Sequence, residues 1–109
     1  MKLMPLRIPQ GWSIYLNHFT ETDIESLDPD CDDDWLFLVQ DISLFRRFEV
    51  KGKYNIDIDL GWYPEGEPSG SFKIYVIKNY DWDFPLEVFS SRSSKDIADK
   101  LEYFFEKYN

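Results

Sequence analysis

The chain has 109 residues, with 21 Asp or Glu and 12 Lys or Arg, which gives a formal net charge of −9. This length predicts a single domain, residues 1–109, built around one hydrophobic core. With 43% hydrophobic and 18% aromatic residues, the chain has enough apolar surface to exclude a disordered protein. The negative charge excludes nucleic acid as the preferred partner, because binding to phosphates requires Lys and Arg.

Cysteine usage and the apolar runs predict a cytoplasmic protein. Cys31 is the only cysteine, so it can form neither an internal disulfide nor a structural zinc cluster. Residues 1–9 include two prolines and no apolar segment of the length that a secretory signal needs. The longest apolar run, residues 35–39, is far shorter than the roughly 20 residues of a membrane span. We therefore expect no membrane partner, and we expect no cofactor.

The excess negative charge is concentrated in one third of the chain. Residues 8–45 contain nine acidic residues and no Lys or Arg, whereas the acidic residues elsewhere are matched by the 12 basic ones. The densest part is residues 28–34, with the sequence DPDCDDD, which we call the acidic loop. Asp and Pro disfavour helix and strand interiors, so this segment is expected to be a loop, with a helix N-terminus after it as one option.

The first predicted elements are strands. Residues 11–19 alternate between apolar and polar side chains, with Trp12, Ile14 and Leu16 on one face. Residues 35–50 are ambiguous, because they contain both a helical apolar stripe and an alternating pattern. Their bulky and β-branched content favours one long strand, and a helix remains the alternative.

The clearest strand pattern covers residues 54–62. Its apolar residues share one face, and Asp57 and Asp59 lie on the opposite face, which we expect to face water. Beyond it we expect a hairpin loop, a strand, an aromatic loop and a short edge strand, at residues 64–70, 71–78, 80–85 and 86–89 respectively.

The end of the chain is predicted to be helical. Ser93 is a suitable N-cap, with Asp96 three residues later. Apolar residues then follow with helical spacing, namely Ile97, Leu101, Phe104, Phe105 and Tyr108. Strands followed by one helix predict an α+β fold, in which an antiparallel β-sheet of about five strands carries a C-terminal helix packed on one face.

The sequence lacks the residue sets that catalysis requires, so we expect no enzyme. His18 is the only histidine, and its place in an apolar strand pattern favours packing over a role as general base. Cys31 lies among acidic residues, which disfavour the thiolate that a nucleophile needs. Asp57 and Asp59 are roughly 7 Å apart on one strand face. This pair leaves a metal-dependent hydrolase as a minor alternative.

Aromatic and acidic residues are interleaved in two predicted loop regions, residues 61–68 and 79–84. Tyr and Trp dominate protein–protein hot spots because they bring large, rigid contact area. For any single aromatic residue, packing back onto the core is the competing interpretation. With the acidic loop and the strand carboxylates, these regions give the candidate partner-binding residues Asp30, Asp32, Asp33, Asp34, Asp57, Asp59, Trp62, Tyr63, Glu65, Glu67, Tyr80, Asp81, Trp82 and Asp83.

The chain resembles small immunity proteins of bacterial contact-dependent growth-inhibition and related polymorphic-toxin systems. The similarity covers residues 35–105 and lies in the order of Gly61-Trp62-Tyr63-Pro64, Gly70-Ser71-Phe72, Tyr75-Val76-Ile77, Trp82, Pro85-Leu86, Phe89, Ser91-Arg92-Ser93 and a closing helix. It implies a cytoplasmic antitoxin that binds the C-terminal toxin domain delivered by a neighbouring cell, in a 1:1 complex. Many such toxins are nucleases, with an RNase favoured here, and the immunity protein commonly blocks the active site. The resemblance assigns no interface residue.

The acidic and aromatic surface also fits a second class of function. An adaptor or regulatory module with a non-toxin partner would present the same surface but would not rescue a cell from a toxin. Acidity alone also favours solubility. In each binding hypothesis the expected partner is a basic protein, because complementary charge speeds association.

Overall fold

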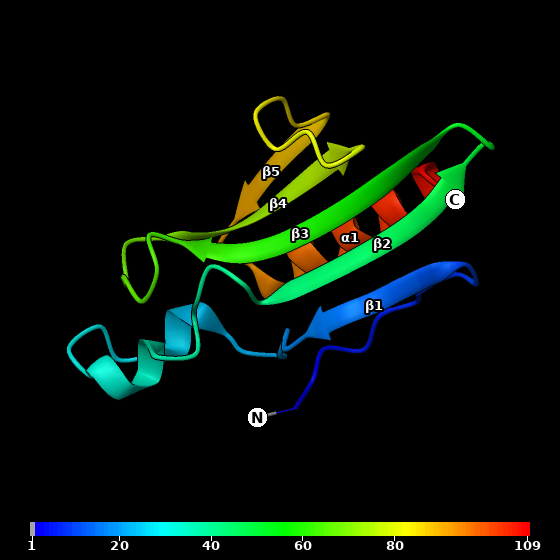
Figure 1. Cartoon of the computed structure of the whole chain (residues 1–109). Coiled ribbons are helices and arrows are strands. Elements are labelled where there is room, and N and C mark those ends of the chain that lie inside the picture. The colour runs from blue at the N-terminus through cyan, green and yellow to red at the C-terminus, as the bar shows by residue number, and fades with distance from the viewer. Residues whose placement is uncertain (1) are drawn as a thin grey trace.

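The computed structural model describes residues 2–109, which form one open antiparallel sheet with a helix across one face (Figure 1). The strand order is β1-β2-β3-β4-β5, so each strand pairs with the next one along the chain. The elements are β1 (Trp12–Asn17), the 3-10 helices η1 (Ile24–Ser26) and η2 (Asp32–Trp35), β2 (Ser43–Val50), β3 (Tyr54–Tyr63), β4 (Ser71–Lys78), β5 (Glu87–Ser91) and α1 (Ser94–Lys107). The predicted α+β fold is confirmed.

The core lies between the sheet and α1. The helix begins as its sequence predicts, because the Ser93 Oγ accepts a hydrogen bond from the Asp96 backbone N–H at 3.2 Å. Its apolar stripe is buried against the alternate β3 residues that were predicted to share one face. Edge-to-face ring contacts join helix and sheet, with Phe45 and Phe105 centroids 5.0 Å apart. No helix in residues 2–109 is long and apolar enough to cross a membrane.

The segment 35–50 is only partly the long strand that was predicted. Strand β2 covers Ser43–Val50, whereas the chain before it is irregular and follows the short helix η2. Trp35 and Leu38 are both buried, and the Leu38 N–H donates to the Trp35 carbonyl at 3.1 Å. The three Asp residues of η2 favour a helical turn, because negative charge is stabilised at a helix N-terminus. Of the helix that was the alternative for residues 35–50, only this turn after η2 is present.

Strand β1 departs from simple alternation. Its pairing with β2 shifts between Ile14 and Leu16, which places an extra residue, Tyr15, in the ladder. The predicted apolar face is broken there, and Ile14 is 55% exposed. At the other edge, β5 covers Glu87–Ser91 rather than residues 86–89. The sheet face opposite α1, turned toward the viewer in Figure 1, is covered by no helix of residues 2–109, and we call it the helix-free face.

Candidate protein-interaction site

Hydrogen bonds between its own residues hold the acidic loop in one conformation. The Asp28 N–H donates to Asp34 Oδ2 at 3.0 Å, and the Asp30 N–H donates to Asp28 Oδ1 at 2.9 Å. The Asp28 carbonyl accepts a hydrogen bond from the Trp35 indole at 2.8 Å. Asp28 and Asp34 therefore fix the backbone, and the exposed carboxylates of Asp30, Asp32 and Asp33 remain for a partner.

A buried pair of tryptophans ties the acidic loop to the hairpin between β3 and β4. The rings of Trp35 and Trp62 are 5.9 Å apart, and Trp62 donates from Nε1 to the Glu67 carbonyl at 2.9 Å. Trp62 is 0% exposed. The end of β3 carries the ring of this candidate partner-binding residue into the core, which is the competing interpretation stated above for a single aromatic residue.

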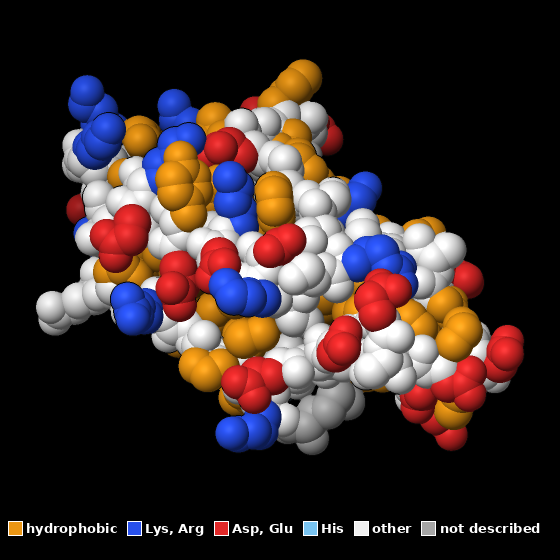
Figure 2. All heavy atoms as spheres, turned by 180° about the vertical axis from the view of Figure 1, so that it is seen from behind, with side chains coloured by type: hydrophobic (Ala, Val, Ile, Leu, Met, Phe, Trp, Pro, Cys, Tyr) orange, Lys and Arg blue, Asp and Glu red, His pale blue; other side chains and the backbone are white. Residues whose placement is uncertain are grey.

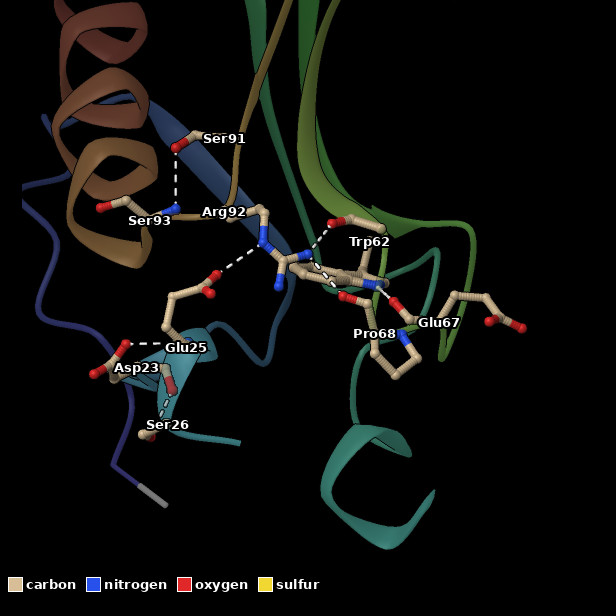
Figure 3. Close-up of polar contacts among 10 residues, drawn as sticks. Asp23, Glu25, Ser26, Trp62, Glu67, Pro68, Ser91, Arg92 and Ser93 are labelled. Atoms are coloured by element: carbon tan, nitrogen blue, oxygen red, sulfur yellow. Dashed lines mark hydrogen bonds and ion pairs between the residues drawn. The ribbon is translucent and has the colours of Figure 1, made fainter. Parts of the chain in front are cut away.

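Arg92, at the junction of β5 and α1, holds this end of the molecule together (Figure 3). Its guanidinium lies 5.5 Å from the Trp62 ring centroid and donates from Nη1 to the carbonyls of Pro68 and Gly70, the former at 2.7 Å. Its Nε forms an ion pair with Glu25 at 2.8 Å. No local sequence pattern predicts these contacts of Arg92, because its partners come from distant segments of the chain.

The β3–β4 hairpin lies beside the segment that leads into β2. The Gly66 N–H donates to the Leu38 carbonyl at 2.8 Å, and the Gln40 N–H donates to Glu65 Oε1 at 3.1 Å. Glu65 and Glu67 are exposed. We call the region formed by residues 21–34 and 64–70 the acidic end. Figure 2 shows acidic side chains gathered at the end of the molecule that contains η1 and η2.

The second predicted loop group lies at the opposite end of β4. The hairpins that flank β4 leave from its two ends, and the strand spans roughly 25 Å at about 3.3 Å per residue. Tyr80, Asp81, Trp82 and Asp83 are exposed, as expected for a loop. The structure therefore does not join them to the acidic end in one continuous site.

Asp57 is bound within the sheet and is not a free surface group. Arg46 donates from Nε and Nη2 to the two carboxylate oxygens of Asp57 at 2.6 and 2.8 Å. The rings of Tyr15 and Tyr80 lie 4.8 and 4.7 Å from the Arg46 guanidinium. The expectation that Asp57 faces water is wrong: its side chain is 1% exposed, because Arg46 covers it from the neighbouring strand.

Asp59 is also buried, with 8% exposure, and the same expectation is wrong for it. Unlike that of Asp57, its carboxylate forms no hydrogen bond or ion pair with residues 2–109. Burial, and then the charges of Asp41 and Asp57, raise the pKa of Asp59 to about 7. Half-buried Tyr63 lies nearby, and burial followed by the Asp59 charge raises the pKa of Tyr63 to about 12.

The minor hydrolase alternative gains no metal centre from this geometry. Within residues 2–109, no group of three or more His, Cys, Asp or Glu side chains could hold a metal ion. Asp57 is already saturated by a guanidinium, which disfavours it as a ligand. A cleft of about 560 Å³ lies beside Arg92, and its lining mixes Glu25 with Lys95.

Comparison with protein-family models, curated proteins and solved structures finds no match. The similarity to immunity proteins thus stays an interpretation of the residue pattern. What supports a function is the geometry and charge of the described residues.

Proposed function

We propose that the chain is an immunity protein that binds a cognate toxin domain and neutralises it by covering the basic active site of a nuclease, with an RNase favoured. The observation that carries this proposal is the fixed acidic loop, in which Asp28 and Asp34 hold the backbone while Asp30, Asp32 and Asp33 stay exposed. A surface ordered before binding loses little conformational entropy when the complex forms.

The chemistry of the partner follows from the carboxylates. A nuclease active site holds phosphates with Lys and Arg, and the same donors form charge-assisted hydrogen bonds to carboxylates. Glu65 and Glu67 lie on the adjoining hairpin and extend the negative surface beyond the loop. The acidic end can therefore occupy a basic cleft that otherwise binds nucleic acid.

Co-expression with the polypeptide encoded just upstream of this chain, as the candidate toxin, tests the proposal. We expect the chain to rescue growth and to co-purify with the toxin as a 1:1 complex that inhibits RNA cleavage in vitro. Rescue without any physical complex, or a complex without rescue, contradicts an inhibitor that covers the active site.

A matched pair of charge variants tests the role of the acidic loop. We expect Asp30→Asn, Asp32→Asn and Asp33→Asn together to slow association at low salt by about tenfold or more and to flatten its salt dependence. Asp34 is left unchanged because its carboxylate holds the loop.

The control removes the same charge elsewhere, with Glu49→Gln, Asp99→Asn and Glu106→Gln, three exposed positions. We expect its association rate to stay within about twofold of the parent rate, because these charges lie away from the docking surface. Equal slowing by both triple variants means that only net charge matters, and the acidic end is then not the docking surface.

A further inference from the structure

The helix-free face contains a carboxylate that has no hydrogen-bond or ion-pair partner in residues 2–109. Asp59 lies between Leu44 on β2 and Tyr75 on β4, and its carboxylate forms no hydrogen bond or ion pair with residues 2–109. Buried carboxylates are normally paired or hydrogen-bonded, because removing a charge from water is unfavourable. Among the described residues, the fully enclosed side-chain N or O atom that lacks a hydrogen-bond partner is Arg47 Nε. The Asp59 oxygens also lack a partner but are not fully enclosed, so they retain some contact with solvent.

The groups around Asp59 do not neutralise it. Asp41 and Asp57 add negative charge, and the guanidinium beside Asp57 is fixed by two hydrogen bonds and two tyrosine rings. Lys73 shares this sheet face, opposite Gly61, but forms no ion pair with Asp59 in residues 2–109. Tyr63 and Tyr75 are the remaining titratable neighbours.

Aromatic rings and backbone shape complete the site. Tyr63 and Tyr75 meet edge to face with centroids 5.9 Å apart. Because Gly61 has no side chain, the Gln40 backbone can lie against this face of β3. A Cβ at Gly61 would lie only 2.1 Å from the Gln40 carbonyl oxygen. The close approach of Gln40 brings the exposed Asp41 beside β3. Carboxylates with aromatic rings at one place are the groups that recognise organic cations.

We propose that Asp59, with Asp41 and the rings of Tyr63 and Tyr75, binds one Lys or Arg side chain of the partner protein. We call these four side chains the cation pocket. The proposal rests on the proposed function, because the cation pocket would contact the same partner. Glu65 lies close enough to influence the Tyr63 hydroxyl, so the pocket adjoins the acidic end. A metal ion is a poorer occupant, since no set of three ligand side chains exists in residues 2–109.

A direct test uses arginine blocked at both ends as the probe and follows the Asp59 carboxyl carbon by NMR. We expect saturable shifts at Asp59, Tyr63 and Tyr75, and none with blocked norleucine, which lacks the charge. Affinity should rise about tenfold between pH 6 and pH 8, because a group with a pKa of about 7 changes from about one-tenth to nine-tenths ionised.

Two variants distinguish arginine binding at Asp59 from general attraction to the negative charge of the protein. Asp59→Asn should weaken arginine binding at least tenfold, whereas Glu106→Gln, at an exposed position on α1, should leave it within twofold. Equal binding by both variants, shifts confined to the acidic loop, or saturation by Mg²⁺ in place of arginine would overturn the pocket.

The pocket and the proposed function can fail separately. If the toxin complex forms but arginine does not perturb Asp59, the pocket is overturned and the immunity function stands. If arginine binds at Asp59 but no complex or rescue is seen with the toxin, the immunity function is overturned and the pocket stands as a cation site.

Discussion

The Arg92 guanidinium lies against the buried Trp62 indole, 5.5 Å from its ring centroid, and caps the β3–β4 hairpin through two carbonyls. Trp62 in turn packs on Trp35, whose indole N–H holds the Asp28 carbonyl of the acidic loop. The start of α1 is thereby connected to the acidic loop through three side chains. The shape of the proposed docking surface therefore depends on the contacts of Arg92, Trp62 and Trp35.

Replacing Arg92 tests this connection. We expect Arg92→Ala to lower the free energy of unfolding by about 2–3 kcal/mol, because it removes a cation–π contact and charged hydrogen bonds to two carbonyls. Lys95→Ala, which breaks an exposed ion pair with Asp99, should leave the free energy of unfolding nearly unchanged. Urea unfolding followed by tryptophan fluorescence measures both, and equal effects would contradict the role given to Arg92.

The indole of Trp35 is predicted to keep the acidic loop ordered. Trp35→Phe removes the hydrogen bond to the Asp28 carbonyl while keeping an aromatic ring, and should lower stability by about 1–2 kcal/mol. Hydrogen exchange should quicken at the Asp28 and Asp30 amides in particular. Trp82→Phe is the control, because Trp82 is 48% exposed in a different loop, and its amide exchange should match the parent protein. Unchanged exchange in Trp35→Phe would show that the loop is held by other contacts.

The Arg46–Asp57 pair is predicted to be needed for folding as a pair. Asp57→Ala should destabilise the protein by about 3–5 kcal/mol, because it leaves a guanidinium uncompensated within the sheet. The double variant Arg46→Met, Asp57→Leu should recover part of that loss, since neither residue is then charged. Thermal unfolding of the single and double variants provides the measurement. A double variant less stable than Asp57→Ala would contradict the pairing.

Local patterns in the sequence predict the core elements but not the burial of the opposite face. Alternation over Tyr54–Tyr63 and the Ser93 cap depend on nearby residues, and both agree with the structure. The burial of Asp57 depends on Arg46, 11 residues away, reaching across a strand pair. A pattern within one strand shows only that Asp57 faces away from the core, and not what lies over it.

The candidate site was predicted in part for the same reason. The exposed carboxylates of the acidic loop follow from composition, because Asp and Pro favour turns. Trp62 and Tyr80 were grouped because aromatic and acidic residues are interleaved around both, but β4 separates the two regions. Arg92 was overlooked because its contacts reach across 67 residues, to Glu25, and no local pattern encodes them.

The raised pKa of Asp59 predicts that stability falls as pH rises. Below about pH 4 the carboxyl is protonated in both states and contributes nothing. Between pH 4 and about 7 the unfolded chain releases this proton while the folded chain keeps it, so ionisation favours unfolding. Above about pH 7 the carboxyl is ionised in both states and its contribution is constant and unfavourable. Asp59→Asn should therefore be more stable than the parent at pH 8, by about 1–3 kcal/mol, with little difference at pH 4.

The difference in unfolding free energy between Asp59→Asn and the parent, measured by urea unfolding at several pH values, isolates this group from other titrating residues. The matched control is Asp83→Asn, an exposed loop carboxyl, whose difference from the parent should not grow between pH 4 and pH 8. If Asp59→Asn is less stable than the parent at pH 8, the carboxylate has a stabilising partner in the folded protein. An unpaired Asp59 on the helix-free face would then be ruled out. The proposed binding of a partner's Lys or Arg at Asp59 would be ruled out with it.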